Sequence, residues 1–155
     1  MDINQIKRGI GGWLALFCIG LIILGPLRTL GNIGQTMSEL EKNGQFFDKY
    51  PGICNLFRFD MAVSGIISIF GISVGLNLYH IRYDAVKMAK TYLLVVMSYG
   101  CVYGLSPILF SGLPEELEKF LWDASIRAAL TSLVSAGIWF AYLNKSRRVK
   151  NTYLS

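Results

Sequence analysis

The fold is decided by residues 114–153, which read PEELEKFLWDASIRAALTSLVSAGIWFAYLNKSRRVKNTY. This stretch begins with acidic residues, continues through an apolar segment that carries one arginine, Arg127, and closes on aromatic and basic residues. An apolar segment of this length with an aromatic and basic end is typical of a transmembrane helix. We therefore expect a membrane span over 124–144, followed by a basic cytoplasmic tail over 145–155.

Three more apolar blocks precede this segment, over 9–27, 61–81 and 91–113. Each is close to the ~20 residues that a helix needs to cross a ~30 Å hydrocarbon core. Hydrophobic residues make up 53% of the chain and charged residues only 16%, so few polar side chains remain to cover four such helices in water. The sequence predicts a single all-α domain over 1–155, an integral membrane bundle of four transmembrane helices.

The longest connection between the expected spans is 28–60. Thr36 and Glu39 fit a capping box, which predicts a short helix inside it. Asn43-Gly44 and Pro51-Gly52 are typical helix breakers. We expect a larger, partly helical outer loop between the first two spans.

The net charge of +5 is distributed unevenly along the chain. Basic residues gather before the first span, between the second and third, and after the fourth, whereas acidic residues gather in the other connections. Positively charged segments stay on the cytoplasmic side of a membrane, so we expect both termini in the cytoplasm. Because topology explains the basic residues, the lipid bilayer is the expected partner and nucleic acid is not.

Small residues recur four apart within the spans, as in Gly71-x-x-x-Gly75 and Gly100-x-x-x-Gly104. Ala128, Ser132 and Ala136 follow the same spacing in the fourth span. Small residues let two membrane helices approach closely, so these faces predict helix–helix contacts within a compact bundle.

Charged residues near the outer ends of the spans form a candidate outer polar cluster. Its members are Arg28, Arg58, Asp60, Asp123 and Arg127. Counting back from Asn144 at 1.5 Å per residue places Arg127 about 25 Å up the helix, near the outer edge of a ~30 Å core. The cluster is interpreted as a collar of paired charges; the alternative is a site for an anion or a lipid headgroup.

Below Arg127, Thr131 and Ser135 continue along one helix face as a candidate polar stripe. Such hydroxyls commonly make hydrogen bonds between membrane helices, and the alternative is that they line a pathway for a solute.

Groups that carry catalysis or bind metals are sparse in this sequence. His80 is the only histidine, and the three cysteines show no C-x-x-C spacing. Metal sites and acid–base catalysis need several such groups to converge. The sequence therefore predicts no catalytic, cofactor-binding or metal-binding residues, and no enzyme.

Two motifs at the ends of the chain are more specific. The first is Gly11-Gly12-Trp13-Leu14, and the second runs over 139–153 as WxxYLxxSxRVKxTY. With four spans between them, the chain resembles a bacterial family of small four-helix inner-membrane proteins classed as a domain of unknown function. The resemblance implies an inner-membrane location and brings no activity or catalytic residues.

The second motif predicts an anchor at the inner membrane interface. Its residues are Trp139, Tyr142, Ser146, Arg148, Lys150, Thr152 and Tyr153. Trp and Tyr prefer the headgroup level, and basic residues lie just beyond it. A pattern this particular also suggests that residues 146–153 dock on something, either the inner connection 82–90 of the same chain or another protein.

Three function classes remain open. The sequence favours a non-catalytic accessory or assembly subunit that acts through helix packing and its basic tail, with a membrane protein or a second copy as partner. The second class is a small oligomeric transporter or channel for an anionic or polar solute, with an arginine-lined outer mouth. The third and least favoured class is a membrane enzyme acting on lipid headgroups.

Overall fold

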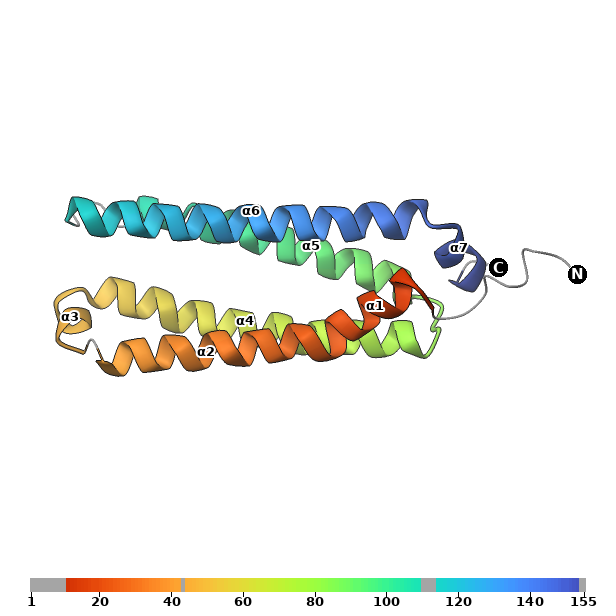
Figure 1. Ribbon diagram of the computed structural model, residues 1–155, viewed down its shortest axis with the longest axis horizontal. Coiled ribbons are helices and arrows are strands. Elements are labelled where there is room, and N and C mark those ends of the chain that lie inside the picture. The colour runs from red at the N-terminus through yellow and green to blue at the C-terminus, as the bar shows by residue number, and fades with distance from the viewer. Residues whose placement is uncertain (1–10, 43, 110–113, 154–155) are drawn as a thin grey trace, which may run out of the picture.

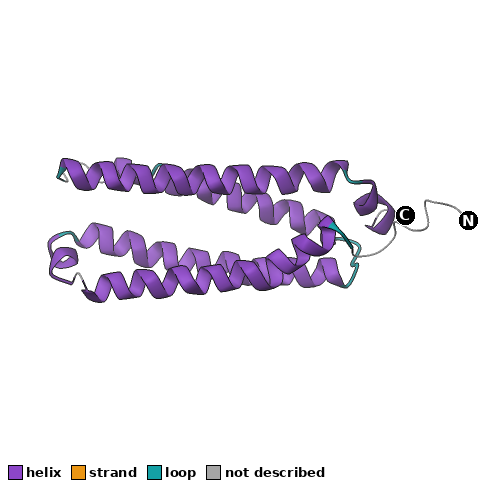
Figure 2. Ribbon diagram, viewed as in Figure 1, coloured by secondary structure: helices purple, strands orange, loops and turns teal. Residues whose placement is uncertain are grey.

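The computed structural model describes residues 11–42, 44–109 and 114–153, and within these ranges it is built of helices with no strand (Figure 2). The first hairpin contains α1 (Trp13–Ile19), the π-helical turn η2 (Gly20–Leu24), α2 (Gly25–Lys42), α3 (Gly44–Lys49) and α4 (Pro51–Tyr79). The second contains α5 (Ala85–Gly104), the 3₁₀ turn η3 (Ser106–Leu109), α6 (Glu115–Lys145) and α7 (Arg147–Tyr153).

Four helical segments are long and apolar enough to cross a membrane. They are Trp13–Lys42, Pro51–Tyr79, Ala85–Gly104 and Leu121–Lys145. The all-α class and the four candidate spans are therefore confirmed, while the side of the membrane on which each end lies stays a prediction. Residues 9, 10, 110–113, 154 and 155 of the expected spans and tail lie outside the described residues.

The expected outer loop, 28–60, is mostly helical. α2 continues through Arg28 to Lys42, and α4 begins at Pro51, so the two helices form one long hairpin closed by α3. Nothing between Arg28 and Lys42 forces a break, because the glycines at 31 and 34 weaken a helix without ending it. Pro51 starts α4 because its fixed φ suits the first helical position.

Pro26 lies inside this first helical segment. A proline within a helix lacks an N–H, and its ring clashes with the carbonyl one turn earlier. The π-helical turn directly before it, where Gly25 N–H bonds Gly20 C=O, widens the helix at this point. The segment consequently bends between α1 and α2 without ending (Figure 1).

Most of the buried apolar residues that join the two hairpins lie at one end. Figure 1 shows the α2–α4 pair and the α5–α6 pair close together where α1 and α7 lie, and apart toward α3. We call the end with α1 and α7 the inner end and the end with α3 the outer end. The main buried cluster follows the same pattern. Its residues come from α1, the start of η2, the last turns of α4, the first half of α5, the last half of α6 and α7. The bundle is thus a wedge that opens outward.

Within the second hairpin, α5 and α6 approach closely at small residues. A Cβ on Gly100 would lie 2.9 Å from Ser132 Cβ, and one on Gly104 would lie 2.8 Å from Ala129 Cβ. These distances are too short for any side chain larger than hydrogen. In the first hairpin, Gly75 lies against Ile22 in the same way. Gly100, Gly104 and Ser132 make the predicted small-residue contacts, whereas Ala128 is exposed and its neighbour Ala129 faces α5 instead.

Candidate functional site

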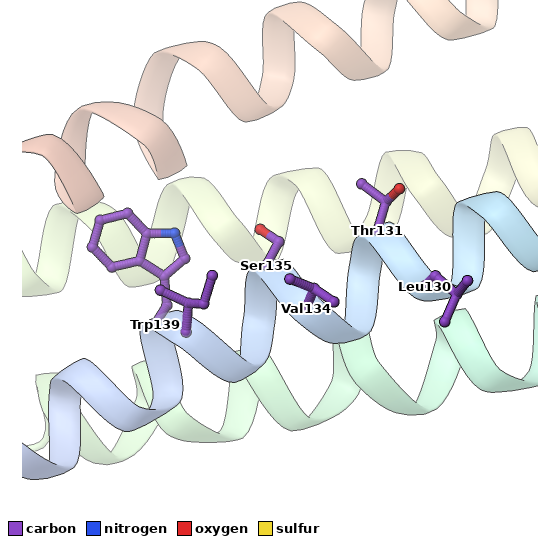
Figure 3. Close-up of a pocket in the computed structure, with 6 residues that line it drawn as sticks. Leu130, Thr131, Val134, Ser135 and Trp139 are labelled. Carbon is purple, nitrogen blue, oxygen red and sulfur yellow. The ribbon is translucent and has the colours of Figure 1, made fainter.

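A groove of ≈ 550 Å³ runs along α6 in the middle of the molecule. It is lined by Leu130, Thr131, Val134, Ser135, Ile138 and Trp139. In Figure 3, Thr131, Ser135 and Trp139 project from the side of α6 that faces α1 and α4. The two members of the predicted polar stripe therefore lie in one open groove, and all of its lining residues belong to α6.

Both hydroxyl groups in the groove belong to α6, and neither makes a hydrogen bond to another described helix. Thr131 Oγ1 donates to the carbonyl of Arg127 at 2.8 Å, within the same helix. In the part of the chain that the structure describes, Ser135 makes no hydrogen bond. The structure does not show the interhelical hydrogen bonds that were the commoner expectation for this stripe.

The five residues of the outer polar cluster do not form a collar. Within the described ranges no ion pair joins any two of them, and Arg28, Arg58, Asp123 and Arg127 are exposed. Arg28 also lies deeper than expected, because it follows Ile22 by only six residues, whereas Asp60 precedes Gly75 by fifteen. At 1.5 Å per residue, this places Arg28 on the order of 10 Å closer to the inner end than Asp60.

Asp60 is paired with a tyrosine that the sequence interpretation missed. Tyr99 Oη on α5 donates to Asp60 Oδ1 on α4 at 2.5 Å, and the Tyr103 ring lies 6.3 Å from that of Tyr99. The bond joins the two hairpins in the outer half, where apolar contacts are few. The spacing of Tyr92, Tyr99 and Tyr103 along one helix face was the available signal.

At the inner end, Trp139 is the centre of an aromatic cluster. Its ring lies 4.6 Å from Phe17, 6.3 Å from Trp13 and 5.9 Å from Tyr142, measured between centroids. Edge and tilted arrangements of this kind are favourable between aromatic rings. The cluster closes the inner end of the groove and joins α6 to α1, the first and last long segments of the chain.

The C-terminal motif folds back onto the inner end of the same chain. Ser146 is extended and ends α6, and its Oγ accepts a hydrogen bond from Val149 N–H at 3.4 Å to begin α7. Val149 and Tyr153 are buried, and Tyr153 Oη donates to the carbonyl of Leu78 at 2.6 Å. α7 also contacts α5, so residues 146–153 dock on the end of α4 and the start of α5.

Arg148 connects the two terminal motifs. A Cβ on Gly11 would lie 2.7 Å from Arg148 Nη1, and one on Gly12 would lie 3.2 Å from the same atom. Gly12 also adopts a φ of 57°, a backbone conformation that side chains disfavour. The glycines therefore leave the space that the guanidinium occupies.

A family model described as "Protein of unknown function (DUF2569)" matches residues 7–154. The chain belongs to this family. The resemblance suggested by the two terminal motifs is thereby confirmed, and the structure shows that these motifs contact each other. No curated protein and no solved structure matches the chain.

The inner end of this DUF2569 protein carries an exposed basic surface, which we call the basic inner face. It consists of Arg82, Lys87, Lys145, Arg147 and Lys150. In the described part of the chain none of these residues forms an ion pair. Thr152 of the C-terminal motif is half-buried and lies in α7, the helix that also carries Arg147 and Lys150.

Groups that could hold a metal ion do not converge in the described ranges of the DUF2569 protein, where no three His, Cys, Asp or Glu residues cluster. Cys18 is buried, Cys54 is half-buried and Cys101 is exposed, and all three are free thiols. His80 contacts the carbonyl of Leu76 through Nδ1 at 2.8 Å and lies at the end of α4.

Proposed function

We propose that this DUF2569 protein is a non-catalytic accessory or assembly subunit, whose basic inner face binds an acidic surface of a partner membrane protein. The observation that carries the proposal is the docking of α7. Val149 and Tyr153 bury one side of this short helix, while Arg147 and Lys150 remain exposed on it.

A docked helix presents its charges differently from a free tail. Three contacts hold α7 in place: the Ser146 cap, the Tyr153–Leu78 hydrogen bond and the packing of Val149. Fixed charges lose less conformational entropy on binding than charges on a flexible chain, and they complement an acidic surface in one orientation. This supports recognition of a partner of defined shape.

The experiment reverses charge on the basic inner face. We expect the Arg147→Glu/Lys150→Glu variant to lose a specific protein that crosslinks to the wild type in native membranes and co-purifies with it. The matched control is Lys42→Glu/Lys119→Glu, which reverses two exposed charges outside the basic inner face. It should retain that protein.

Two results would contradict the proposal. One is the same set of co-purified proteins for wild type and both variants. The other is a change in bound anionic lipid alone, because basic residues near a membrane also attract such lipids at about 1 kcal/mol each. Equal unfolding temperatures of the three proteins would show that the variants are folded.

A second candidate is the small oligomeric transporter, and the groove on α6 favours it. Thr131 and Ser135 both line this groove, as a pathway for a polar solute requires. The Thr131→Leu variant in vesicles should then fold normally and lose solute flux. Equal flux in vesicles with and without the wild-type protein would exclude this candidate.

A further inference from the structure

The groove on α6 combines an apolar trough with a cation at its outer end. We propose that it binds one membrane phospholipid with an anionic headgroup. The acyl chain lies along α6, and the Arg127 guanidinium holds the headgroup phosphate. This inference is independent of the basic inner face, which lies at the other end of the groove.

The walls of the groove suit an acyl chain. Leu130, Val134 and Ile138 are 57%, 60% and 63% exposed, and together they form a continuous apolar strip on α6. The Thr131 hydroxyl is already bonded to the Arg127 carbonyl, so hydrocarbon can cover it without leaving that donor unsatisfied. The Ser135 hydroxyl lines the same groove without a hydrogen bond in the described ranges, and an acyl chain that covered it would cost the energy of one unpaired hydroxyl.

The outer end of the groove suits an anion. Arg127 is one helical turn outward from Thr131 on the same face, it is exposed, and within the described residues no carboxylate pairs with it. Arginine presents five N–H donors in a planar fork that matches phosphate oxygens. The groove therefore has its positive charge where a phospholipid has its negative one.

The length of the groove is also close to the thickness of one leaflet of a bilayer. Arg127 and Trp139 are separated by about 18 Å along the helix at 1.5 Å per residue. One leaflet of a ~30 Å hydrocarbon core is about 15 Å thick. With Arg127 at the outer headgroup level, Trp139 would lie about 3 Å beyond the bilayer midplane and not at the inner headgroup level that its sequence motif suggests. An acyl chain of one leaflet would then end beside the aromatic cluster around Trp139.

A second membrane helix is a poorer occupant of this face. Close packing between membrane helices uses small residues, and the small residues of α6 at 125, 129 and 132 already contact α5. The groove face carries Leu130, Val134 and Ile138 beside Thr131 and Ser135, and the three branched side chains keep another backbone at a distance. A flexible acyl chain adapts to such a surface.

The test uses the full chain, purified in mild detergent and examined by native mass spectrometry with phosphatidylglycerol and phosphatidylcholine of identical acyl chains. We expect one phosphatidylglycerol to be retained. Arg127→Gln should lower the preference for phosphatidylglycerol over phosphatidylcholine about tenfold, because a hydrogen bond to a charged group is lost. Val134→Trp should fill the groove and reduce the retention of both lipids.

The matched control for the groove-filling variant is Ile69→Trp, at a residue on α4 that is 67% exposed and does not line the groove. It should bind lipid as the wild type does. Equal lipid retention by Val134→Trp and Ile69→Trp, or an unchanged headgroup preference in Arg127→Gln, would overturn the proposal.

A second measurement covers the case in which Val134→Trp does not fold. A small fraction of phosphatidylglycerol with brominated acyl chains is added to phosphatidylcholine bilayers that contain the protein. It should quench the fluorescence of Trp139 more than the same fraction of brominated phosphatidylcholine, with the Trp139→Phe variant defining the contribution of this residue. Equal quenching by the two lipids would also overturn the proposal.

Discussion

At the residue scale, the inner end depends on a few contacts between distant parts of the sequence. Tyr153 donates a hydrogen bond to the carbonyl of Leu78 in the last turn of α4, and Arg148 occupies the space left by Gly11 and Gly12. Each contact joins the last residues of the chain to a segment far from them in sequence. Changes at these residues should therefore affect the stability of the bundle as well as that of α7.

The Tyr153 hydroxyl gives the first prediction. Tyr153→Phe removes a hydrogen bond from a buried side chain and should lower the free energy of unfolding by about 1 kcal/mol. Thermal unfolding of the purified protein measures the difference. Tyr83→Phe is the matched control because Tyr83 is 86% exposed, and a loss of equal size there would contradict the explanation.

The same residue predicts a dependence on alkaline pH. Burial raises the pKa of the Tyr153 phenol above its ordinary value of 10.0, and the nearby Cys18 and Tyr142 raise it further. Above pH 10 the unfolded chain therefore loses this proton before the folded protein does, and stability falls as pH rises. Unfolding temperatures measured from pH 8 to above pH 10 should fall more steeply for the wild type than for Tyr153→Phe. Parallel curves for the two proteins would show that the Tyr153 phenol does not contribute to the pH dependence of stability.

At the element scale, the α5–α6 pair and α7 are held in different ways. α5 and α6 approach closely over several turns because Gly100 and Gly104 face small residues of α6. α7 is only seven residues long, too short to be stable alone, and depends on its cap and on its buried side chains. The α5–α6 contact extends over several turns, whereas the docking of α7 depends on individual residues.

The seam between α5 and α6 gives the next prediction. Gly100→Ala places a Cβ 2.9 Å from Ser132 Cβ, and the overpacking should cost about 1–3 kcal/mol of unfolding free energy. Gly65→Ala is the control, since a Cβ at that glycine in α4 would meet nothing within 4 Å. It should be neutral or stabilise the helix by about 0.5–1 kcal/mol. Equal destabilisation by both variants would refute close packing at Gly100.

Docking of α7 gives a further prediction. Val149 is 1% exposed, so Val149→Ala should weaken the docking by about 2 kcal/mol and expose α7 to trypsin, which cleaves after Arg147, Arg148 and Lys150. The cleavage rate in mild detergent measures the effect. Val102→Ala, at a residue 65% exposed on α5, should leave the rate unchanged. If trypsin cleaved Val149→Ala as slowly as the wild type, Val149 would not be what holds α7.

At the scale of the whole molecule, the wedge shape follows from where the buried residues lie. The main apolar cluster lies at the inner end, while the outer half is bridged by the Asp60–Tyr99 hydrogen bond. The orientation of the wedge in the membrane rests on the distribution of charge.

That orientation gives the last prediction. If the basic end is cytoplasmic, a membrane-impermeant maleimide added to spheroplasts should label Cys54, near the outer start of α4. A cysteine placed by Tyr83→Cys in the turn after α4 should react only after the membrane is permeabilised. Because Cys101 is also an exposed thiol, Cys54 is labelled in a Cys101→Ser background and Tyr83→Cys in a Cys54→Ser/Cys101→Ser background. Labelling of Tyr83→Cys in sealed spheroplasts would mean that the orientation is reversed.

The sequence by itself determined the helical class, the four candidate spans and the family, because these follow from apolar segment length and from local motifs such as Gly11-Gly12-Trp13. Only the tertiary structure decided that Asp60 pairs with Tyr99, that α7 docks on Leu78 and that Thr131 and Ser135 share a groove. The length and composition of an apolar segment are properties of a single helix, so they can be recognised in the sequence. Contacts between helices depend on crossing angles and relative depth, which charge and spacing alone do not specify.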